Sequence, residues 1–372
     1  MEIHVKINIK NILFRMEDNR TKKLAKLAIK YCLDVKPNEN VVISGSTETE
    51  EFINELYKQV ILAKANPLVK IHPKDTDFFF FKKANEKQLK NFPKYWYEMV
   101  KDADHYITID TAFNTRELSS CDPKKIAMRM KAVEKVEEYI YNTRDKLISL
   151  TITYPCLAYA IEADMSFDEW KDFVYSSCLI DWKKFSKKYG KVAKHFHKGE
   201  EVHLIGENVD LKFSIKNKNA ILEDGKENMP GGEIFMAPVR TSMNGWIKFE
   251  FPSIYNGNDI RDIFLRFKKG KVIEAEASKN KKVLTAALNA DKNSSYVGEF
   301  GIGINPRINR FTNNLMFDEK MNGTIHLALG MAYIENGGGN DSVIHWDLVK
   351  DMHKAKIVVD GKVVQENGKW KI

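Results

Sequence analysis

The first half of the chain alternates between helical and strand-like patterns of hydrophobic residues. From Thr21, the segment TKKLAKLAIKYCL has apolar residues at helical spacing, and VKPNEN ends this pattern before the strand-like VVISG at 41–45. An amphipathic helix is predicted next in EEFINELYKQVILAKA, and a strand follows in LVKIH. Strand, helix and strand within about thirty residues form a βαβ unit, whose strands lie parallel.

Two further strands extend this predicted sheet. They are HYITID at 105–110 and LISLTITYP at 147–155, and a long helix between about Pro123 and Arg144 separates them. The first half is therefore predicted to be an α/β domain with an open, doubly wound, largely parallel sheet and flanking helices. The turn SGSTETE after the first strand has neither GxGxxG nor GxxxxGK[ST], so we expect a polar loop that caps a helix rather than a nucleotide site.

The pattern changes from helices to strands near residue 200. A helical segment is predicted over 165–196, with Ser166 as its N-cap and acidic residues in its first turn, and the Lys-rich run through Lys198 is expected to bridge two domains. From Glu201 the predicted strands are EVHLIG, VDLKFSIK, GWIKFEFPSIY, DIFLRFKKGKVIEAEAS and KIVVDGKVVQENGKWKI, and NKKVLTAALNA is the one predicted helix. This texture indicates an α+β, mainly antiparallel domain.

Length and composition agree with two folded domains. The chain has 372 residues, of which 43% are hydrophobic and 30% are charged, as is typical of globular proteins. We expect an α/β N-terminal domain with its helical bridge over 1–198 and an α+β C-terminal domain over 199–372. The net charge of +8 comes from 59 basic and 51 acidic residues, without an Arg-rich run or an aromatic RNA-binding signature. We therefore expect solvated surface and no nucleic-acid partner.

Cysteine usage and the N-terminus bear on the compartment. The four cysteines show no CxxC or paired spacing, so neither a zinc ribbon nor a disulfide framework is indicated, and a reducing cytoplasm fits. The N-terminal MEIHVKINIKNILFRM alternates apolar and charged residues and is not predicted to be a signal peptide. No apolar run approaches the ~18 to 20 residues that span a bilayer, so no membrane association is expected.

Four phrases place a metal-capable side chain inside an apolar, strand-like run. They are MPGGEIFMAPV at 229–239, VGEFGIGINP at 297–306, TIHLALGMAY at 324–333 and VIHWDLV at 343–349. His195 and His197 flank Phe196 and could also bind a metal, but no carboxylate or Cys of obvious spacing accompanies them. We expect these two histidines at the exposed end of a helix or linker.

The last phrase places two potential ligands on one side of a strand. Residues two apart share a face, so His345 and Asp347 should point together while Trp346 faces the other way. Alone, such a pair is more often a hydrogen-bonded pair than a ligand set. The metal hypothesis gains weight because burying several more uncompensated groups would cost several kcal/mol each. These further candidates are Glu233, Glu299, Glu319 and His326.

Read together, the four phrases resemble the thermophilic metallo-aminopeptidase family, the peptidases of the aminopeptidase T and aminopeptidase S type. The resemblance runs from about Leu24 to Asp351 and includes LAKLAIKYCLDVKPNENVVISG, TRELSSCDPKKIA and TYPCLAYAIEADMS. It implies a cytoplasmic exopeptidase that removes N-terminal amino acids from peptides with a free N-terminus. It further implies loose side-chain preference, two divalent metal ions and a homodimer.

The resemblance also assigns residues. The family's metal-binding positions match Glu233, Glu299, His326, His345 and Asp347. Glu319 resembles a further carboxylate that the family places shortly before the histidine of TIHLALG, although its spacing differs, and Tyr333 matches the active-site tyrosine. The chain departs from the family between Tyr333 and His345, where a short IENGGGNDSVI replaces a longer insertion. This difference affects the expected entrance and side-chain preference of the site.

These residue types suit peptide hydrolysis by two cations. Ions ~3.5 to 4 Å apart can activate a shared water and polarise a carbonyl, and carboxylates with imidazoles and no thiolate accept Zn, Co, Mn or Mg. We expect Glu299 to be a bridging ligand or proton shuttle and Tyr333 to donate its hydroxyl to the oxyanion. Glycines beside the ligands either let the backbone approach the metals or form turns and bulges. They are glycines 231, 232, 298, 301 and 303.

Two competing functions remain open. The first is a non-catalytic metal-bound scaffold, or a binding module whose α/β half engages a small molecule or peptide. The presence of the whole ligand set together with Tyr333 argues against it, because a protein without activity has no use for both. The second is nucleic-acid binding through the net charge, which would show as a steep loss of affinity with salt. Asn228, Arg240 and Arg307 lie near the key phrases and are open as substrate contacts.

Overall fold

The N-terminal half is built on a parallel sheet. The computed structural model describes residues 18–143 and 145–372, so the N-terminal segment tested above for a signal peptide lies outside the described residues. All four strand pairings are parallel, which confirms the predicted open sheet. In sheet order the strands are β2 (Asn66–His72), β1 (Asn40–Ser46), β3 (His105–Asp110), β4 (Ile148–Thr153) and β8 (Asn228–Met229).

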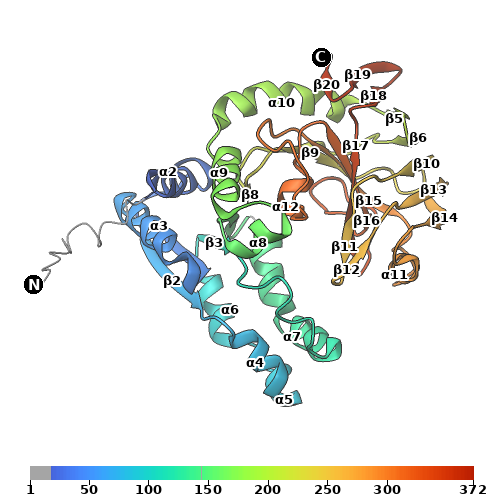
Figure 1. The fold of residues 1–372 in the computed structure, drawn as a ribbon. Coiled ribbons are helices and arrows are strands. Elements are labelled where there is room, and N and C mark those ends of the chain that lie inside the picture. The colour runs from blue at the N-terminus through green and yellow to red at the C-terminus, as the bar shows by residue number, and fades with distance from the viewer. Residues whose placement is uncertain (1–17, 144) are drawn as a thin grey trace, which may run out of the picture.

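Helices cover both faces of this sheet (Figure 1). Val41 and Ile43 of β1 pack toward α2 and α3, whereas Val42 packs toward α6 and α7, because successive strand residues point to opposite faces. The helices of this half are α2 (Asn19–Leu27, continued by one π-helical turn, Ala28–Cys32), α3 (Glu50–Leu62, preceded by the 3₁₀ turn Thr47–Thr49), α4 (Thr76–Lys83), α5 (Glu86–Leu89), α6 (Lys94–Lys101), α7 (Pro123–Asn142) and α8 (Leu157–Glu162).

The helical segment before the second half is broken in two. Ser166 caps α9 (Phe167–Cys178) through a capping box with Glu169, as its sequence predicts. The prediction of one continuous helix is wrong, because the chain turns after Cys178 and α10 (Trp182–Lys198) starts with a new N-cap. Asp181 accepts a hydrogen bond from the Lys184 N–H at that point.

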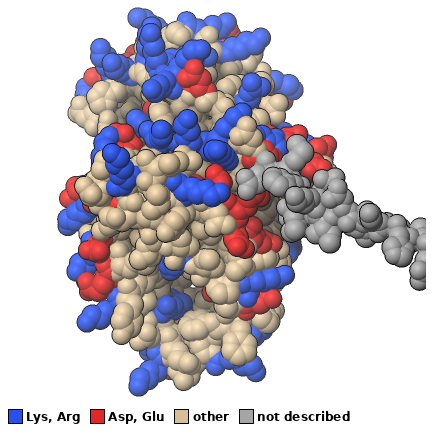
Figure 2. Space-filling view, turned by 90° about the vertical axis from the view of Figure 1, so that its left-hand side faces the viewer, with Lys and Arg blue, Asp and Glu red and all other residues tan. Residues whose placement is uncertain are grey.

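Helix α10 is strongly amphipathic. Its aromatic and aliphatic residues are buried, and its seven lysines are all exposed. Lys and Arg side chains gather in the upper part of the face drawn in Figure 2, at the level that α10 occupies in Figure 1. Both histidines lie in the last turn of this helix, where His197 is exposed as expected and His195 is partly buried.

The second half is mainly antiparallel, as predicted. Its larger sheet contains β14 (Lys271–Glu276), β13 (Phe264–Lys268), β10 (Asn244–Lys248), β6 (Val209–Ser214), β5 (Glu201–Gly206), β18 (Ala355–Val359), β19 (Lys362–Glu366) and β20 (Lys369–Trp370) in that order. A second sheet contains β17 (His345–Asp351), β16 (Thr324–Gly330), β15 (Val297–Gly303), β9 (Glu233–Met236) and β7 (Ile221–Glu223). The remaining elements are the β11 (Ser253–Tyr255) and β12 (Asn258–Ile260) hairpin, α11 (Lys281–Leu288) and α12 (Leu315–Asp318).

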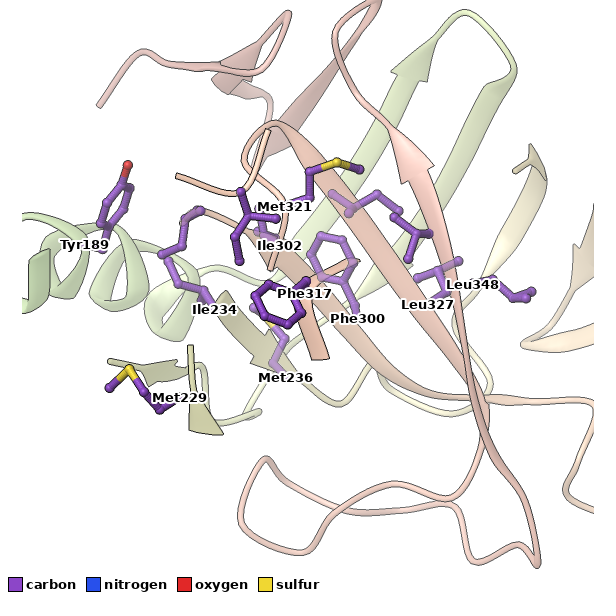
Figure 3. Close-up of a cluster of buried hydrophobic side chains, with 14 of the residues drawn as sticks. Tyr189, Met229, Ile234, Met236, Phe300, Ile302, Phe317, Met321, Leu327 and Leu348 are labelled. Carbon is purple, nitrogen blue, oxygen red and sulfur yellow. The ribbon is translucent and has the colours of Figure 1, made fainter. Parts of the chain in front are cut away.

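The second sheet buries one face in the core. Phe300 on β15 packs edge-on against Phe213 of the larger sheet, with ring centroids 5.0 Å apart. The same strand and its neighbours add apolar side chains to the same face, and Figure 3 shows this cluster around Phe300. They include Ile234, Met236, Ile302, Leu327 and Leu348. Because successive strand residues point to opposite faces, the residues between these apolar side chains lie on the other face of the sheet.

The two halves share structure across the predicted boundary at residues 198 and 199. Strand β8 lies in the second half of the sequence but pairs with β4 of the first sheet, with Thr151 opposite Asn228. Phe196 of α10 lies within 6.5 Å of Phe300, measured between ring centroids, so one apolar core continues from the helix into the second half. The division into two domains stays a prediction. In the described part of the chain, no helix is both long and apolar enough to cross a membrane.

Candidate metal centre

The predicted ligands come from four adjacent strands and share one face of the second sheet. Glu233 is on β9, Glu299 on β15, His326 on β16, and His345 and Asp347 on β17. Each alternates with an apolar residue that points into the core, as strand geometry requires. The sequence pattern therefore places all five side chains on the face opposite the cluster in Figure 3.

These side chains form two groups with the spacing of metal ligands. Glu233, Glu299 and His326 present ligand atoms that all lie within 4.8 Å of one another, and so do Glu299, His345 and Asp347. His326 Nε2 lies 3.2 Å from Glu299 Oε1 and 3.4 Å from Glu233 Oε2. His345 Nε2 lies 3.5 Å from Asp347 Oδ2. Glu299 belongs to both groups, so the two groups are adjacent.

Small residues make room for this arrangement. Gly301 stands directly opposite His326 in the β15–β16 ladder, and a Cβ built on Gly301 would lie 2.0 Å from the His326 ring. The imidazole therefore lies across a backbone that only glycine leaves open. Ala328 stands between Glu299 and Asp347 in the three-strand register, where its methyl group leaves the two carboxylates facing the same space.

Burial and proximity change the protonation of the group. Burial raises the pKa of Glu233 to about 8 and also raises the pKa of Glu299. For His326, burial lowers the pKa, but the hydrogen bond to Glu299 and the charge of Glu233 outweigh it and raise the pKa to about 10. Burial likewise opposes the charged form of His345, yet Asp347 and Glu299 raise its pKa above the ordinary value. Without metal, bound protons reduce the electrostatic repulsion between these buried carboxylates.

Two carboxylate oxygens of the ligand groups lack a hydrogen-bond donor, which fits a metal site. Glu233 Oε2 and Asp347 Oδ1 are buried and accept no hydrogen bond from any described residue. Leaving buried polar atoms unpaired is costly, and cations are among the partners that relieve it. Carboxylate oxygens and imidazole nitrogens without a thiolate are the ligands expected for Zn, Co, Mn or Mg. The donor set thus suits divalent cations.

Glu319 lies next to the centre but in neither group. It directly follows α12, and its carboxylate is in contact with the ammonium of Lys320. Lys320 is fully buried, and its Nζ also lies 3.2 Å from Glu233 Oε1. Burial alone would lower the pKa of Lys320, but Glu233 and Glu319 raise it well above the usual range. Lys320 therefore connects Glu319 to the ligand set as a fixed positive charge.

The centre lines a cavity of about 370 Å³ between the two halves of the chain. Tyr141, Ser149 and Thr151 of the α/β half form one wall, and the ligand face of the second sheet forms the other. Tyr333 also lines the cavity, with its ring centroid 4.9 Å from that of His345. Burial raises the pKa of Tyr333, so its hydroxyl keeps its proton at neutral pH. Seven of the lining residues are Asp or Glu.

The other candidates have separate roles. Trp346 faces away from the centre, as predicted, and donates a hydrogen bond from Nε1 to Ser253 Oγ at 2.7 Å. Asn228 lines the cavity and remains open as a substrate contact. The Arg240 guanidinium donates hydrogen bonds to Asn340 Oδ1 at 2.8 Å and to Asn293 Oδ1 at 2.7 Å, so it connects two loops.

Three buried polar residues beside the centre were not predicted from the sequence. Glu223 accepts hydrogen bonds from four backbone N–H groups of residues 225–232 and so shapes the loop that carries Glu233 into the centre. Lys320 and Asn336 also touch ligand side chains. Only Lys320 had a signal in the sequence, since it directly follows Glu319; the other two depend on contacts between distant segments.

Comparison with known proteins agrees with this geometry. The family described as thermophilic metalloprotease (M29) matches residues 17–370. Aminopeptidase AmpS of Bacillus subtilis (strain 168) is 24% identical over 402 aligned residues, which cover 93% of this chain and 97% of AmpS.

Solved structures show the same fold. Wild-type AmpT from Thermus thermophilus aligns with a TM-score of 0.84 and 21% identity, covering 95% of this chain and 99% of AmpT. The 2,5-dihydroxypyridine dioxygenase of Pseudomonas putida KT2440 aligns with a TM-score of 0.62 and 14% identity, covering 94% of this chain and 96% of the dioxygenase. Because the same architecture occurs in a dioxygenase, the chemistry must be argued from the side chains of the site.

Proposed function

The chain belongs to the thermophilic metalloprotease family (M29) and is a metal-dependent peptidase, and we propose that it removes N-terminal amino acids from peptides by using two divalent ions. The aminopeptidase names of its relatives, AmpS among them, support this activity. The observation that carries the proposal is the pair of three-residue groups joined at Glu299. One carboxylate shared by two adjacent groups of potential ligands is an arrangement that suits two neighbouring metal ions.

Charge supports two ions rather than one. The carboxylates of the two groups, Glu233, Glu299 and Asp347, carry three negative charges in a buried setting, which is more than one dication balances. Glu319 adds a fourth carboxylate beside them, and the Lys320 ammonium contacts it. His326 and His345 complete the set as neutral ligands. Ions bound there would supply an activated water and polarise the scissile carbonyl, and Zn, Co, Mn and Mg all suit these ligands.

Two residues carry the proton and charge chemistry of this chain. Glu299 faces both ligand groups, so its carboxylate either bridges the ions or takes the proton of an attacking water and passes it to the leaving amine. Tyr333 keeps its hydroxyl proton at neutral pH and lines the same cavity, so it can donate a hydrogen bond to the oxyanion that forms during attack.

The cavity supports recognition of a free N-terminus. Besides Glu233, Glu299, Glu319 and Asp347, three more acidic residues line it, and among the described lining side chains His345 is the only basic or imidazole residue. The three are Glu223, Glu227 and Glu335. A substrate ammonium group is attracted by such a site, whereas an acetylated terminus gains nothing from it. The proposal includes peptide substrates with broad side-chain preference, a homodimer, a cytoplasmic location and a two-domain division near residue 199.

The test is hydrolysis of matched substrates. Purified protein should cleave unblocked aminoacyl anilides, leave their N-acetylated forms intact, lose activity in chelator, and regain it with Co, Zn or Mn. A metal-bound scaffold would bind the same ions without turnover. Absence of turnover across a panel of amino acids and metals would reject the peptidase assignment in favour of the scaffold.

A further inference from the structure

The segment between Tyr333 and His345 sends one buried amide into the centre. Asn336 is 0% exposed, and its Nδ2 donates a hydrogen bond to Glu299 Oε2 at 3.4 Å. Its Oδ1 is buried and accepts no hydrogen bond from any residue that the structure describes. The sequence predicts that this segment is shorter than its counterpart in aminopeptidases T and S.

The contact defines how Glu299 is held. An ionised carboxylate can only accept hydrogen bonds, so Asn336 must turn its NH₂ group, rather than its carbonyl, toward Oε2. His326 Nε2 contacts the other oxygen, Oε1, at 3.2 Å. Each oxygen of Glu299 thus has its own nitrogen neighbour, and the two contacts together restrain the orientation of the carboxylate.

The backbone around Asn336 is held independently of its side chain. Its carbonyl oxygen accepts hydrogen bonds from the Asn219 and Ala237 N–H groups at 3.4 and 3.2 Å. Lys218 Nζ donates to the carbonyls of Gly337 and Gly338 at 2.8 and 2.9 Å. These bonds tie the segment to residues beside β7 and β9, so the path of the chain does not depend on the amide.

A purely structural role does not account for this side chain. An unpaired buried carbonyl costs about 1–3 kcal/mol, and an apolar residue of similar size would fill the space without that cost. The side chain's only protein hydrogen bond in the described chain goes to Glu299. We therefore propose that Asn336 is a positioning residue for peptide hydrolysis, which orients Glu299 and acts on the reaction only through it. This inference rests on the proposed function.

Two variants test this role. Asn336→Leu removes the donor at similar volume, and Asn336→Asp replaces the donor with a group that repels Glu299. Ile334→Ala is the matched control, because Ile334 is in the same segment and is 95% exposed. We expect both Asn336 variants to lower kcat by about 10- to 100-fold with KM changed by less than about threefold, as for groups that support metal ligands. The control should behave as wild type.

A second readout does not depend on turnover. Calorimetric titration of the metal-free proteins with Co²⁺ alone should give weaker binding for both Asn336 variants than for wild type and Ile334→Ala, by about 10-fold or more. Folding of each variant is checked by its thermal transition, and Asn336→Asp stands in if Asn336→Leu does not fold. Wild-type kcat and wild-type Co²⁺ affinity in a folded variant would overturn the inference. If wild type itself fails to cleave peptides, the proposed function fails, and the Co²⁺ titration still decides the role of Asn336.

Discussion

Replacing Gly301 with alanine tests whether His326 is a ligand held in place by the sheet. The new Cβ would lie 2.0 Å from both Cε1 and Nε2 of His326, whereas ordinary contact begins at about 3.4 Å. The ring or the strand must therefore move by about 1.4 Å. His326 Nε2 now lies 3.2 Å from Glu299 and 3.4 Å from Glu233, so a shift of this size takes the imidazole out of the ligand group.

The expected loss of activity follows from that displacement. A misplacement of about 1 Å costs on the order of 100-fold in rate, so Gly301→Ala should reduce kcat/KM by at least about 100-fold. Overpacking of a dense core costs typically about 1–3 kcal/mol, so the free energy of unfolding should fall by a similar amount. The protein should thus remain mostly folded, and unfolding alone should not account for the loss of kcat/KM.

The assay compares Gly301→Ala with Gly190→Ala. Gly190 lies in α10, and a Cβ there meets no atom within 4 Å, so alanine should add about 0.5–1 kcal/mol of stability without changing activity. Hydrolysis of an unblocked aminoacyl anilide, bound metal and the thermal transition are measured for both variants. Wild-type activity and metal binding in Gly301→Ala would refute the placement of His326 as a ligand.

Three further outcomes are expected. Glu299→Gln should leave the thermal transition nearly unchanged and lower kcat at least ~100-fold, and a wild-type rate would show that Glu299 has been assigned wrongly. Tyr333→Phe should lower kcat by about 100- to 1,000-fold with little change in KM in steady-state kinetics, and a change confined to KM would contradict oxyanion stabilisation. Because the pKa is about 8 for Glu233 and about 10 for His326 without metal, both hold protons at pH 7. Metal binding should therefore release protons, and affinity should fall as the pH is lowered below about 10 and more steeply below about 8, as calorimetry in two buffers would reveal.

The sequence predicted the layers of the fold and the face of the ligands because both depend on local periodicity. Alternation in VIHWDLV placed His345 and Asp347 together and Trp346 on the other side, and the structure agrees. The βαβ pattern likewise predicted the parallel sheet. The break at Asp181 was missed because the helical pattern continues through it, and the N-cap appears only once the chain turns.

Contacts between distant segments could not be predicted in this way. The pairing of β8 with β4, the ammonium of Lys320 between Glu233 and Glu319, and the amide of Asn336 on Glu299 all depend on tertiary packing. No periodic pattern in the sequence predicts any of these contacts. Polar groups that support a site are therefore harder to predict than the groups that form it, because they lie on segments of no fixed spacing from the ligands.

A titration of metal-free protein with Co²⁺, followed by hydrolysis of an aminoacyl anilide, tests the dinuclear peptidase most directly. The account predicts two ions bound per chain, activity that returns with the ions, and no cleavage of the N-acetylated anilide under the same conditions. A fully loaded protein that binds two ions but cleaves neither substrate, or cleaves both equally, would contradict it.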